Sequence, residues 1–254
     1  DEKLGSLMPK EHIEKELKEQ EKTDLLNAYK NGEREQRERL REELGMFNEQ
    51  ANVLILGKKR AGKSCLAISL MREFSKYGRD MFFYQHPKPE VLETLPFKIS
   101  NITNIKQLSN LTNAVVLCDE AQKSFGIWEK AINQHLRNIL SVSAQNNVCF
   151  IFVCHNSYFI NRSLFSFIDI KIIKELNNGH FDLERPYMKK LYEDVPVVGI
   201  NKFFIDSDYY RGMEVFDKPE WYTEELSFSY RNEITQDFFR RLMNRVKMPS
   251  RKAE

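Results

Sequence analysis

The sequence predicts an α/β fold with a mostly parallel central sheet flanked by helices, preceded by a charged helical N-terminal arm. Three observations lead to this prediction. Apolar runs of strand length alternate with helix-length segments through the middle of the chain. The first of these runs, 53–56, leads through a glycine-containing loop into an apolar helical pattern. Residues 1–50, in contrast, carry 14 acidic and 10 basic side chains among few apolar ones.

Each strand of the core is predicted from a short run of β-branched and other apolar residues bounded by turn-forming residues. The predicted strands are Val53–Leu56, Met81–Tyr84, Phe97–Ile99, Val115–Cys118, Val148–Cys154 and Ile170–Lys174. The segments between several of them show a helical period, which predicts helices over Lys63–Tyr77, Trp128–Ala144 and Arg162–Ile168. Strand-then-helix order repeated in this way indicates parallel strands with right-handed crossovers.

We expect three parts along the chain: a charged helical arm (1–50), the core (51–176) and a C-terminal extension of the same domain (177–254). The arm has apolar positions too sparse for a long coiled coil, so we expect it to pack on the domain or on a neighbouring subunit.

The extension is punctuated by prolines and is rich in Tyr, Phe and Asp. It predicts a short hairpin from Val197–Ile205 and Met213–Phe216, and a terminal amphipathic helix over Thr235–Lys247.

The loop after the first strand fits the pattern G-x-x-x-x-G-K-[ST], which cradles nucleotide phosphates. Its backbone N–H groups and the helix N-terminus face the anion, Lys63 reaches the β- and γ-phosphates, and the Ser64 hydroxyl ligates Mg²⁺. ATP and Mg²⁺ are therefore the expected ligands. The residues predicted to line this site are Gly57, Lys58, Lys59, Arg60, Ala61, Gly62, Lys63, Ser64 and Cys65.

The three consecutive cations Lys58, Lys59 and Arg60 leave alternatives open. They can strengthen phosphate attraction, touch the site of a neighbouring subunit, or simply face solvent, because the x positions of the motif are permissive.

A second acidic motif follows the strand 115–118. Asp119 lies at the carboxyl end of a predicted parallel strand, where open α/β sheets bind ligands, and suits the Mg²⁺ of the phosphate loop. Glu120 points elsewhere because strand side chains alternate, and it is the predicted general base for an attacking water. The alternative interpretation is an acidic pair that opens a short helix.

The strand 148–154 ends in His155-Asn156. If this strand lies between the phosphate-loop strand and the Asp119 strand, His155 faces the γ-phosphate and can sense it or position water. Asn156 is the alternative for the same role.

These motifs together resemble the FtsK–HerA superfamily of P-loop ATPases, and within it the zonular occludens toxin-like and viral genome-packaging ATPases. The resemblance rests on the phosphate loop, the Asp119-Glu120-Ala121-Gln122 sequence and the polar-tipped strand at His155, with a weaker contribution from the segment 216–227. It implies a RecA-like P-loop NTPase fold, a homo-oligomeric ring that is usually a hexamer, and ATP-driven translocation of double-stranded DNA. A capsid or portal protein is a further implied partner.

Two positions depart from the family pattern. The family usually has glutamine where this chain has His155, and often an arginine before that strand, where this chain has none. If an arginine acts on a neighbour's nucleotide, Arg137 is the catalytic candidate, with Arg162 and Arg60 as others.

Three functions remain open at this stage. The leading one is a DNA-translocating ATPase that packages a viral genome. The second is an ATP-dependent assembly or extrusion factor of the zonular occludens type, although such proteins usually carry a membrane span. The third is a small-molecule kinase or a nucleotide-gated binding module.

The amino-acid composition does not distinguish among these three functions. The formal net charge of +2 gives no global basic signature, although residues 231–254 hold seven basic and three acidic groups, compatible with nucleic acid. The four cysteines lie in apolar patterns without metal-type spacing and predict small core residues in a reducing compartment. The longest apolar run is far below the ~20 residues of a membrane span, so we expect a cytoplasmic protein.

Overall fold

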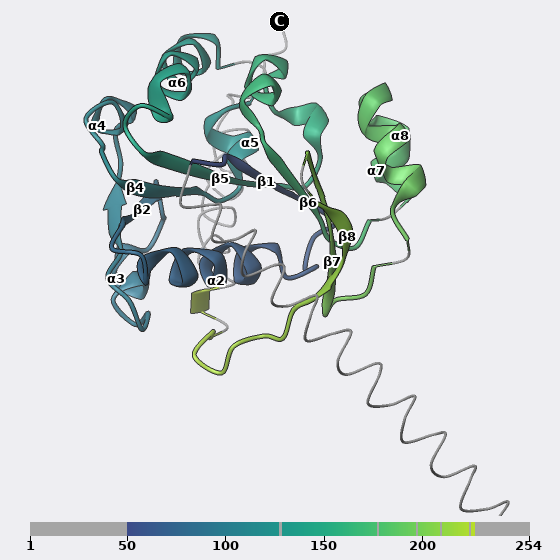
Figure 1. Cartoon of the computed structure of the whole chain (residues 1–254), viewed down its shortest axis with the longest axis horizontal. Coiled ribbons are helices and arrows are strands. Elements are labelled where there is room, and N and C mark those ends of the chain that lie inside the picture. Colours follow the sequence, from purple (N-terminus) through teal and green to yellow (C-terminus); the bar gives the residue numbers. More distant parts are fainter. Residues whose placement is uncertain are drawn as a thin grey trace, which may run out of the picture. The chain divides into compact units, whose positions relative to one another are not determined.

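A mixed eight-stranded sheet runs through the part of the chain that the structure describes, in the order β3-β2-β4-β5-β1-β6-β7-β8 (Figure 1). The structure is a computed structural model, and it describes residues 50–126, 129–176, 178–196, 198–208, 210–223 and 225–226. The predicted N-terminal arm, the predicted helix Thr235–Lys247 and the basic residues from 231 onward lie outside these ranges. The predicted domain limits stay a prediction.

The strands of the sheet are β1 (Val53–Leu56), β2 (Asp80–Tyr84), β3 (Ser100–Ile102), β4 (Ala114–Cys118), β5 (Val148–Cys154), β6 (Ile170–Ile173), β7 (Lys202–Ser207) and β8 (Arg211–Val215). The α-helices among the described residues are α2 (Lys63–Ser75), α3 (Pro89–Leu92), α4 (Ile105–Leu108), α5 (Ala121–Ser124), α6 (Lys130–Ser143), α7 (Asn178–Leu183) and α8 (Pro186–Asp194). Two 3₁₀ helices, Ser157–Phe159 and Arg162–Phe167, follow β5.

The first six strands, β1 to β6, run parallel to one another. β1 pairs with β5 through Val53↔Ile151 and with β6 through Val53↔Ile170, and β5 pairs with β4 on its other side. This placement of β5 between the phosphate-loop strand and the Asp119 strand meets the condition set for a role of His155. It brings the carboxyl ends of β1, β4 and β5 to one edge of the sheet.

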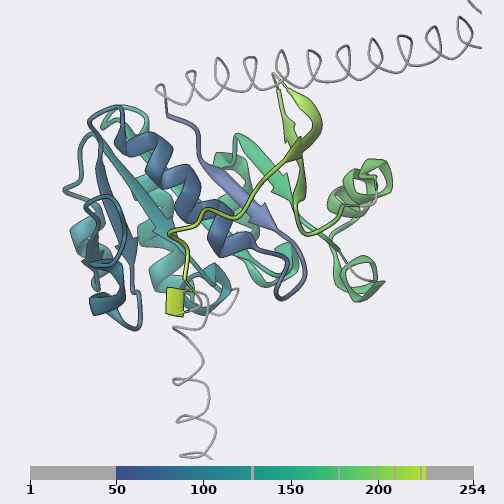
Figure 2. The same cartoon turned by 90° about the horizontal axis from the view of Figure 1, so that it is seen from below.

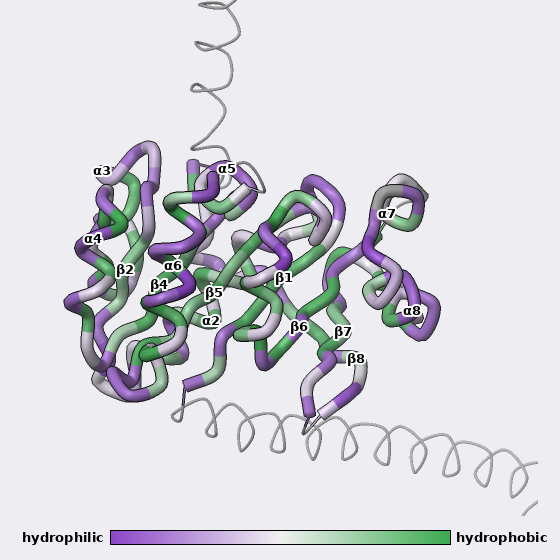
Figure 3. The backbone as a smooth tube through the Cα atoms, turned by 90° about the horizontal axis from the view of Figure 1, so that it is seen from above, coloured by the Kyte–Doolittle hydropathy of each residue, from purple (hydrophilic) through white to green (hydrophobic). Residues whose placement is uncertain are grey.

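Helices cover both faces of this sheet, which explains why its strands are continuous apolar runs rather than alternating ones. Figure 1 shows α2 along one face, with α5 and α6 on the other. Every residue of β1, β4 and β5 is buried. Figure 3 shows the same pattern as hydrophobic strands inside and hydrophilic loops outside. Each large side chain buried here stabilises the fold by about 1.5–3 kcal/mol.

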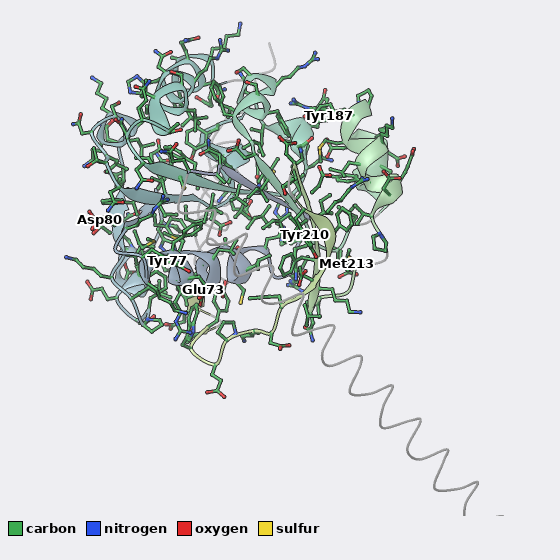
Figure 4. All side chains as sticks on the ribbon, viewed as in Figure 1. Glu73, Tyr77, Asp80, Tyr187, Tyr210 and Met213 are labelled. Atoms are coloured by element: carbon green, nitrogen blue, oxygen red, sulfur yellow. The ribbon has the colours of Figure 1, made fainter. Side chains whose placement is uncertain are left out.

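The sheet continues beyond β6 with an antiparallel hairpin. β7 pairs with β6 through Ile172↔Ile205, and β8 pairs with β7 through Phe204↔Met213. The hairpin forms where the sequence predicted one, with shifted bounds. The turn of the hairpin lies beside the start of β6, since Ile170 pairs with Ser207, and Figure 4 labels the hairpin residues Tyr210 and Met213.

Helices α7 and α8 stand to the side of β6 as a separate helical pair (Figure 2). Glu184, between them, is 5% exposed and ties the pair to the end of β5. Its carboxylate accepts hydrogen bonds from the Ser157 backbone at 3.1 Å, the Ser157 hydroxyl and the Tyr192 hydroxyl at 3.0 Å. These bonds satisfy a buried charge that would otherwise be costly.

Two predicted elements were placed wrongly. The third strand is Ser100–Ile102 and not Phe97–Ile99, because pairing with β2 begins at Phe82↔Ser100 while Phe97 packs against the Trp221 ring. The segment 162–168 is a 3₁₀ helix rather than an α-helix, and Asn161 caps it by accepting from the Ser163 backbone at 3.0 Å.

Among the residues described, no helix is both long and apolar enough to cross a membrane.

Candidate nucleotide-binding site

The phosphate loop joins β1 to α2 at the carboxyl edge of the sheet. Gly57 has φ 151° and Gly62 has φ 81°, backbone conformations that favour glycine. Gly62 is also the N-cap of α2, and no side chain caps this helix. The N–H groups of the first turn therefore lack intrahelical partners and point their positive dipole end at the loop. An anion such as a phosphate group fits that end of the helix.

The Lys63 side chain, 5% exposed, lies inside this loop. Its Nζ donates to the carbonyl oxygens of Gly57 and Lys58, both at 2.9 Å, and lies 3.0 Å from His155 Nδ1. Burial lowers the pKa of Lys63, and the nearby Glu120, Cys154 and Asp119 partly offset that effect. The loop thus holds a desolvated ammonium in the cradle that the sequence predicted for phosphates.

Asp119 follows β4 and lies next to the start of α2. The Ser64 hydroxyl is hydrogen-bonded to its carboxylate, and the backbone N–H of Glu120 donates to Asp119 Oδ1 at 2.9 Å. Burial and the charge of Glu120 raise the pKa of Asp119 to about 6, while Ser64 and Lys63 act to lower it. The two predicted Mg²⁺ ligands, Ser64 and Asp119, are therefore in contact.

Glu120 has a left-handed backbone, φ 50°, which turns the chain sharply from β4 into α5. Its Oε1 lies 3.2 Å from His155 Nε2, and its Oε2 accepts from the Gln122 side chain. Burial acts to raise the pKa of Glu120, but His155, Lys63 and Lys123 outweigh it, so the pKa lies below its ordinary value. The carboxylate is consequently ionised at neutral pH and held in one orientation.

His155 connects the two charged residues. An ammonium can only donate hydrogen bonds, so the contact with Lys63 makes His155 Nδ1 an acceptor. The ring proton then lies on Nε2, which donates to Glu120 Oε1. The result is a continuous path of contacts from the Lys63 ammonium through the His155 ring to the Glu120 carboxylate.

The other polar residue at the end of β5 is engaged differently. Asn156 is 5% exposed, and its side chain accepts from the Tyr158 backbone at 2.7 Å, capping the 3₁₀ turn that follows. Of the two alternatives at this strand end, His155 is the residue that contacts the phosphate loop.

The three loop cations have different surroundings. Lys58 Nζ pairs with Glu175 Oε1 at 2.5 Å, and the Lys58 backbone donates to the Glu175 carbonyl at 2.7 Å. Lys59 and Arg60 are exposed to solvent. Lys58 thus fastens the loop to the segment after β6.

The candidate arginines lie on the surface. Arg137 is exposed on α6, Arg162 is exposed at the start of the second 3₁₀ helix, and Arg60 is exposed in the phosphate loop. Among the contacts of the described residues, none joins Arg137 to Lys63, Asp119 or Glu120. A role for any of them on a neighbour's nucleotide stays a prediction.

Sequence reasoning missed two residues at this edge. The Gln122 side-chain amide donates a hydrogen bond to the Glu120 carboxylate, a role that the sequence motif alone does not indicate. Lys174 follows β6, is fully buried, and packs against the phosphate loop. A lysine directly after the apolar run Ile170–Ile173 is the signal that would have drawn attention to it.

The residues present fit a magnesium nucleotide. Among the residues that the structure describes, no cluster of three or more His, Cys, Asp or Glu side chains could hold a metal ion. Mg²⁺ does not need such a cluster, because it is usually bound through one or two protein oxygens together with substrate phosphates and water. The contact between Ser64 and Asp119 beside the uncapped end of α2 supplies that donor set.

Comparisons with known proteins identify the fold. The sequence matches no protein-family model and no curated protein. The structure resembles that of the genome packaging NTPase B204 from Sulfolobus turreted icosahedral virus 2 in complex with sulfate, with a TM-score of 0.55 and 13% identity. That match covers 67% of this chain and 98% of B204.

The structure of the same NTPase in complex with ATP-gammaS gives a TM-score of 0.52 at 14% identity, covering 67% of this chain and 98% of the other. The pCW3 conjugation coupling protein TcpA with ATPgS gives 0.52 at 11% identity, covering 73% of this chain and 66% of TcpA. At such identities the likeness is one of fold. It confirms the predicted α/β, RecA-like P-loop NTPase architecture.

Proposed function

We propose that this chain is an ATPase whose hydrolysis drives the translocation of double-stranded DNA, in the manner of a viral genome-packaging motor. The observation that carries the proposal is the convergence of Lys63, Asp119, Glu120 and His155 on one edge of a P-loop sheet. The fold likeness to a genome packaging NTPase and to a conjugation coupling protein supports the DNA-moving task.

The phosphate loop binds the nucleotide. Backbone N–H groups at the start of α2 donate to phosphate oxygens, and Lys63 exchanges its bonds with the carbonyls of Gly57 and Lys58 for the β- and γ-phosphates. Ser64 and Asp119 would hold Mg²⁺, which would neutralise charge on the phosphates. Cys65 continues the row of backbone donors.

Glu120 serves as the general base. Its carboxylate is ionised at neutral pH, so it can accept a proton from the attacking water. The water oxygen bonds to the γ-phosphorus as the bond to the leaving ADP oxygen breaks, and the water's proton passes to Glu120. His155 and Gln122 orient the carboxylate by their hydrogen bonds.

His155 has a second task in this proposal. Because it contacts both Lys63 and Glu120, movement of the Lys63 ammonium toward a γ-phosphate removes one of the contacts that hold the imidazole. The orientation of the His155 ring, and with it that of the Glu120 carboxylate, thereby depends on whether a γ-phosphate is bound. The larger assembly, expected to be a homo-oligomeric ring and usually a hexamer, supplies an arginine such as Arg137 to the neighbouring nucleotide.

The test is steady-state ATP hydrolysis by the full chain, with and without double-stranded DNA, at low and moderate salt. Stimulation by DNA of any sequence that fades as salt rises supports a translocating motor, because contacts to DNA phosphates are sequence-independent and salt-sensitive. The variant Lys63→Ala, which loses the phosphate-binding ammonium, controls for contaminating activity.

Hydrolysis that is indifferent to DNA at every salt concentration would contradict the motor and favour an assembly or extrusion factor. Phosphate transfer to an added alcohol acceptor in place of water would favour a kinase.

The role of Glu120 is tested separately. Glu120→Gln keeps the shape and can still accept a hydrogen bond from His155, but it cannot take a proton at neutral pH. We expect ATP binding close to that of the wild type and turnover reduced by at least about 10²-fold. Turnover near the wild-type rate would show that another group activates the water.

A further inference from the structure

Lys174 is a buried lysine beside the phosphate loop that the mechanism above does not use. It follows β6, where its backbone N–H donates to the Leu56 carbonyl at 2.8 Å. A Cβ added to Gly57 would lie 2.9 Å from Lys174 Cβ, and one added to Gly62 would lie 4.0 Å from Lys174 Nζ. The lysine side chain therefore runs along the loop from its first glycine to its last.

Few groups in the fold interact with the positive charge of the Lys174 ammonium. Lys174 has a relative exposure of 0%. Its Nζ donates to the Ile200 carbonyl at 2.6 Å and lies 5.5 Å from the centre of the Phe216 ring. Among the described residues it forms no ion pair, and the carboxylate of the adjacent Glu175 is paired with Lys58. An ammonium offers three donors, so this one carries charge and donors beyond what the protein uses.

A lysine in such a place is costly to stability. Removing a cation from water without an anionic partner disfavours the folded state, and an apolar side chain of similar size would avoid that penalty. Burial is also the cause of its lowered pKa, about 8. If the side chain at 174 only filled the space between the loop and Phe216, methionine would give a more stable fold than lysine.

The Lys174 ammonium lies beside the place where a phosphate group is expected to bind. Gly62 directly precedes the first turn of α2, whose N–H groups have no side-chain cap. Lys63 occupies the inner side of the loop, against the Gly57 and Lys58 carbonyls, whereas Lys174 lies along the side that faces β6. A buried charge acts on its neighbours with little screening by water.

We propose that Lys174 is a second nucleotide-binding lysine, whose ammonium stabilises the phosphate charge from behind the loop. This inference rests on the proposed function, since it assigns a further residue to the same nucleotide site. The ligand it recognises is the polyphosphate of a nucleotide.

The segment after β8 supports this placement. Phe216 packs over the ammonium, and Lys218 lies near enough to Cys65, the third residue of α2, to lower the pKa of its thiol, although burial holds that pKa at about 11. The same segment continues along α2 to Trp221, whose ring lies 5.6 Å from the Arg72 guanidinium (Figures 1 and 2). The nucleotide end of α2 is thus flanked by cations from two separate parts of the chain.

The experiment compares Lys174→Met and Lys174→Gln with the wild-type full chain. The affinity for ATPγS is measured by calorimetry, and the melting temperature is measured without nucleotide. Both variants remove the charge, but only glutamine keeps a hydrogen-bond donor for the Ile200 carbonyl. Lys106→Met, which removes an exposed lysine on α4, is the control for a general loss of positive charge.

We expect both Lys174 variants to bind ATPγS at least about tenfold more weakly, with melting temperatures equal to or above that of the wild type, and Lys106→Met to bind normally. Wild-type affinity in Lys174→Gln would overturn the inference, since the charge would then be dispensable. A lowered melting temperature with unchanged affinity would likewise overturn it and show a structural role. If the wild type itself binds no nucleotide, the proposed function fails before this inference is reached.

Discussion

His155 links the two oppositely charged residues of the candidate site, Lys63 and Glu120. It accepts from the Lys63 ammonium on one ring nitrogen and donates to the Glu120 carboxylate from the other. A neutral imidazole can bridge a cation and an anion in this way only with its proton on Nε2. Glutamine at this position would offer the same pair of groups, an oxygen that accepts and a nitrogen that donates.

We therefore predict that His155→Gln keeps turnover within about fivefold of the wild type, whereas His155→Ala lowers kcat by about 10- to 100-fold by releasing the base from its orientation. Single-turnover hydrolysis at saturating ATP measures this difference. Equal losses in the two variants would mean that the bridge is not what His155 contributes.

Lys174 makes a separate prediction about stability and pH. Its pKa falls from the ordinary 10.5 to about 8 on folding, so between these values the unfolded chain binds more protons than the folded one. Stability due to this residue must then rise with pH through that window, by at most about 3 kcal/mol.

Urea unfolding of the wild type and of Lys174→Met between pH 7 and 10.5 isolates the effect. The difference in unfolding free energy should favour the variant at pH 7 and shrink as pH increases above 8. A difference that stays constant with pH would indicate an unshifted lysine.

At the scale of elements, the phosphate loop depends on the segment after β6. Gly57 has Lys174 Cβ and the Glu175 carbonyl within the space that a side chain would need, and Lys58 is bound to Glu175 by both its backbone and its ammonium. The loop is consequently shaped by β6 as well as by its own sequence. The close approach of this segment leaves no room for a side chain at Gly57.

Gly57→Ala should destabilise the fold by about 1–3 kcal/mol, because the added methyl meets backbone and Cβ atoms that cannot move independently. Gly78→Ala is the matched control. Gly78 also has a positive φ, 72°, but nothing lies within 4 Å of its added Cβ, so only the backbone strain of about 1 kcal/mol remains. Chemical denaturation measures both values, and an equal cost would show that the contact with Lys174 is unimportant.

The end of β5 is held from two sides. His155 faces the phosphate loop, and two residues later Ser157 is bound to the buried Glu184 that joins α7 to α8. Arg185 adds a bond to the Ile160 carbonyl and stacks over the Phe165 ring, with its guanidinium carbon 4.8 Å from the ring centre. The end of β5 thus connects the phosphate loop to the helical pair through direct contacts.

At the scale of the whole molecule, the proposed ring makes a prediction about mixed assemblies. In the proposed motor each subunit depends on its neighbours for an arginine and for a coordinated cycle. Adding Glu120→Gln subunits to the wild type should lower DNA-stimulated turnover more steeply than the fraction of wild-type subunits. Turnover measured over a series of mixing ratios decides this. A linear decline would mean that each active site works alone.

Much of the fold was predictable because its signals are local. Buried apolar runs such as 53–56 and 148–154 predict strands wherever they occur, and the phosphate loop predicts its own strand and helix. The third strand was misplaced because three residues carry too little pattern to distinguish Ser100–Ile102 from the adjacent Phe97–Ile99. Helices α3, α4 and α5 were missed for the same reason, since four residues show no periodicity.

The sequence by itself determined the chemistry available: a phosphate loop ending in Lys63-Ser64, an Asp119-Glu120 pair after one strand and a polar residue after another. These are properties of short segments, so they can be recognised without the rest of the chain. Only the tertiary structure decided that His155 joins Lys63 to Glu120, that Lys58 pairs with Glu175, and that Lys174 lies buried along the loop. Each of these contacts joins residues about 35 to 120 positions apart, and their distances are set by strand order and register, which act through the whole sheet.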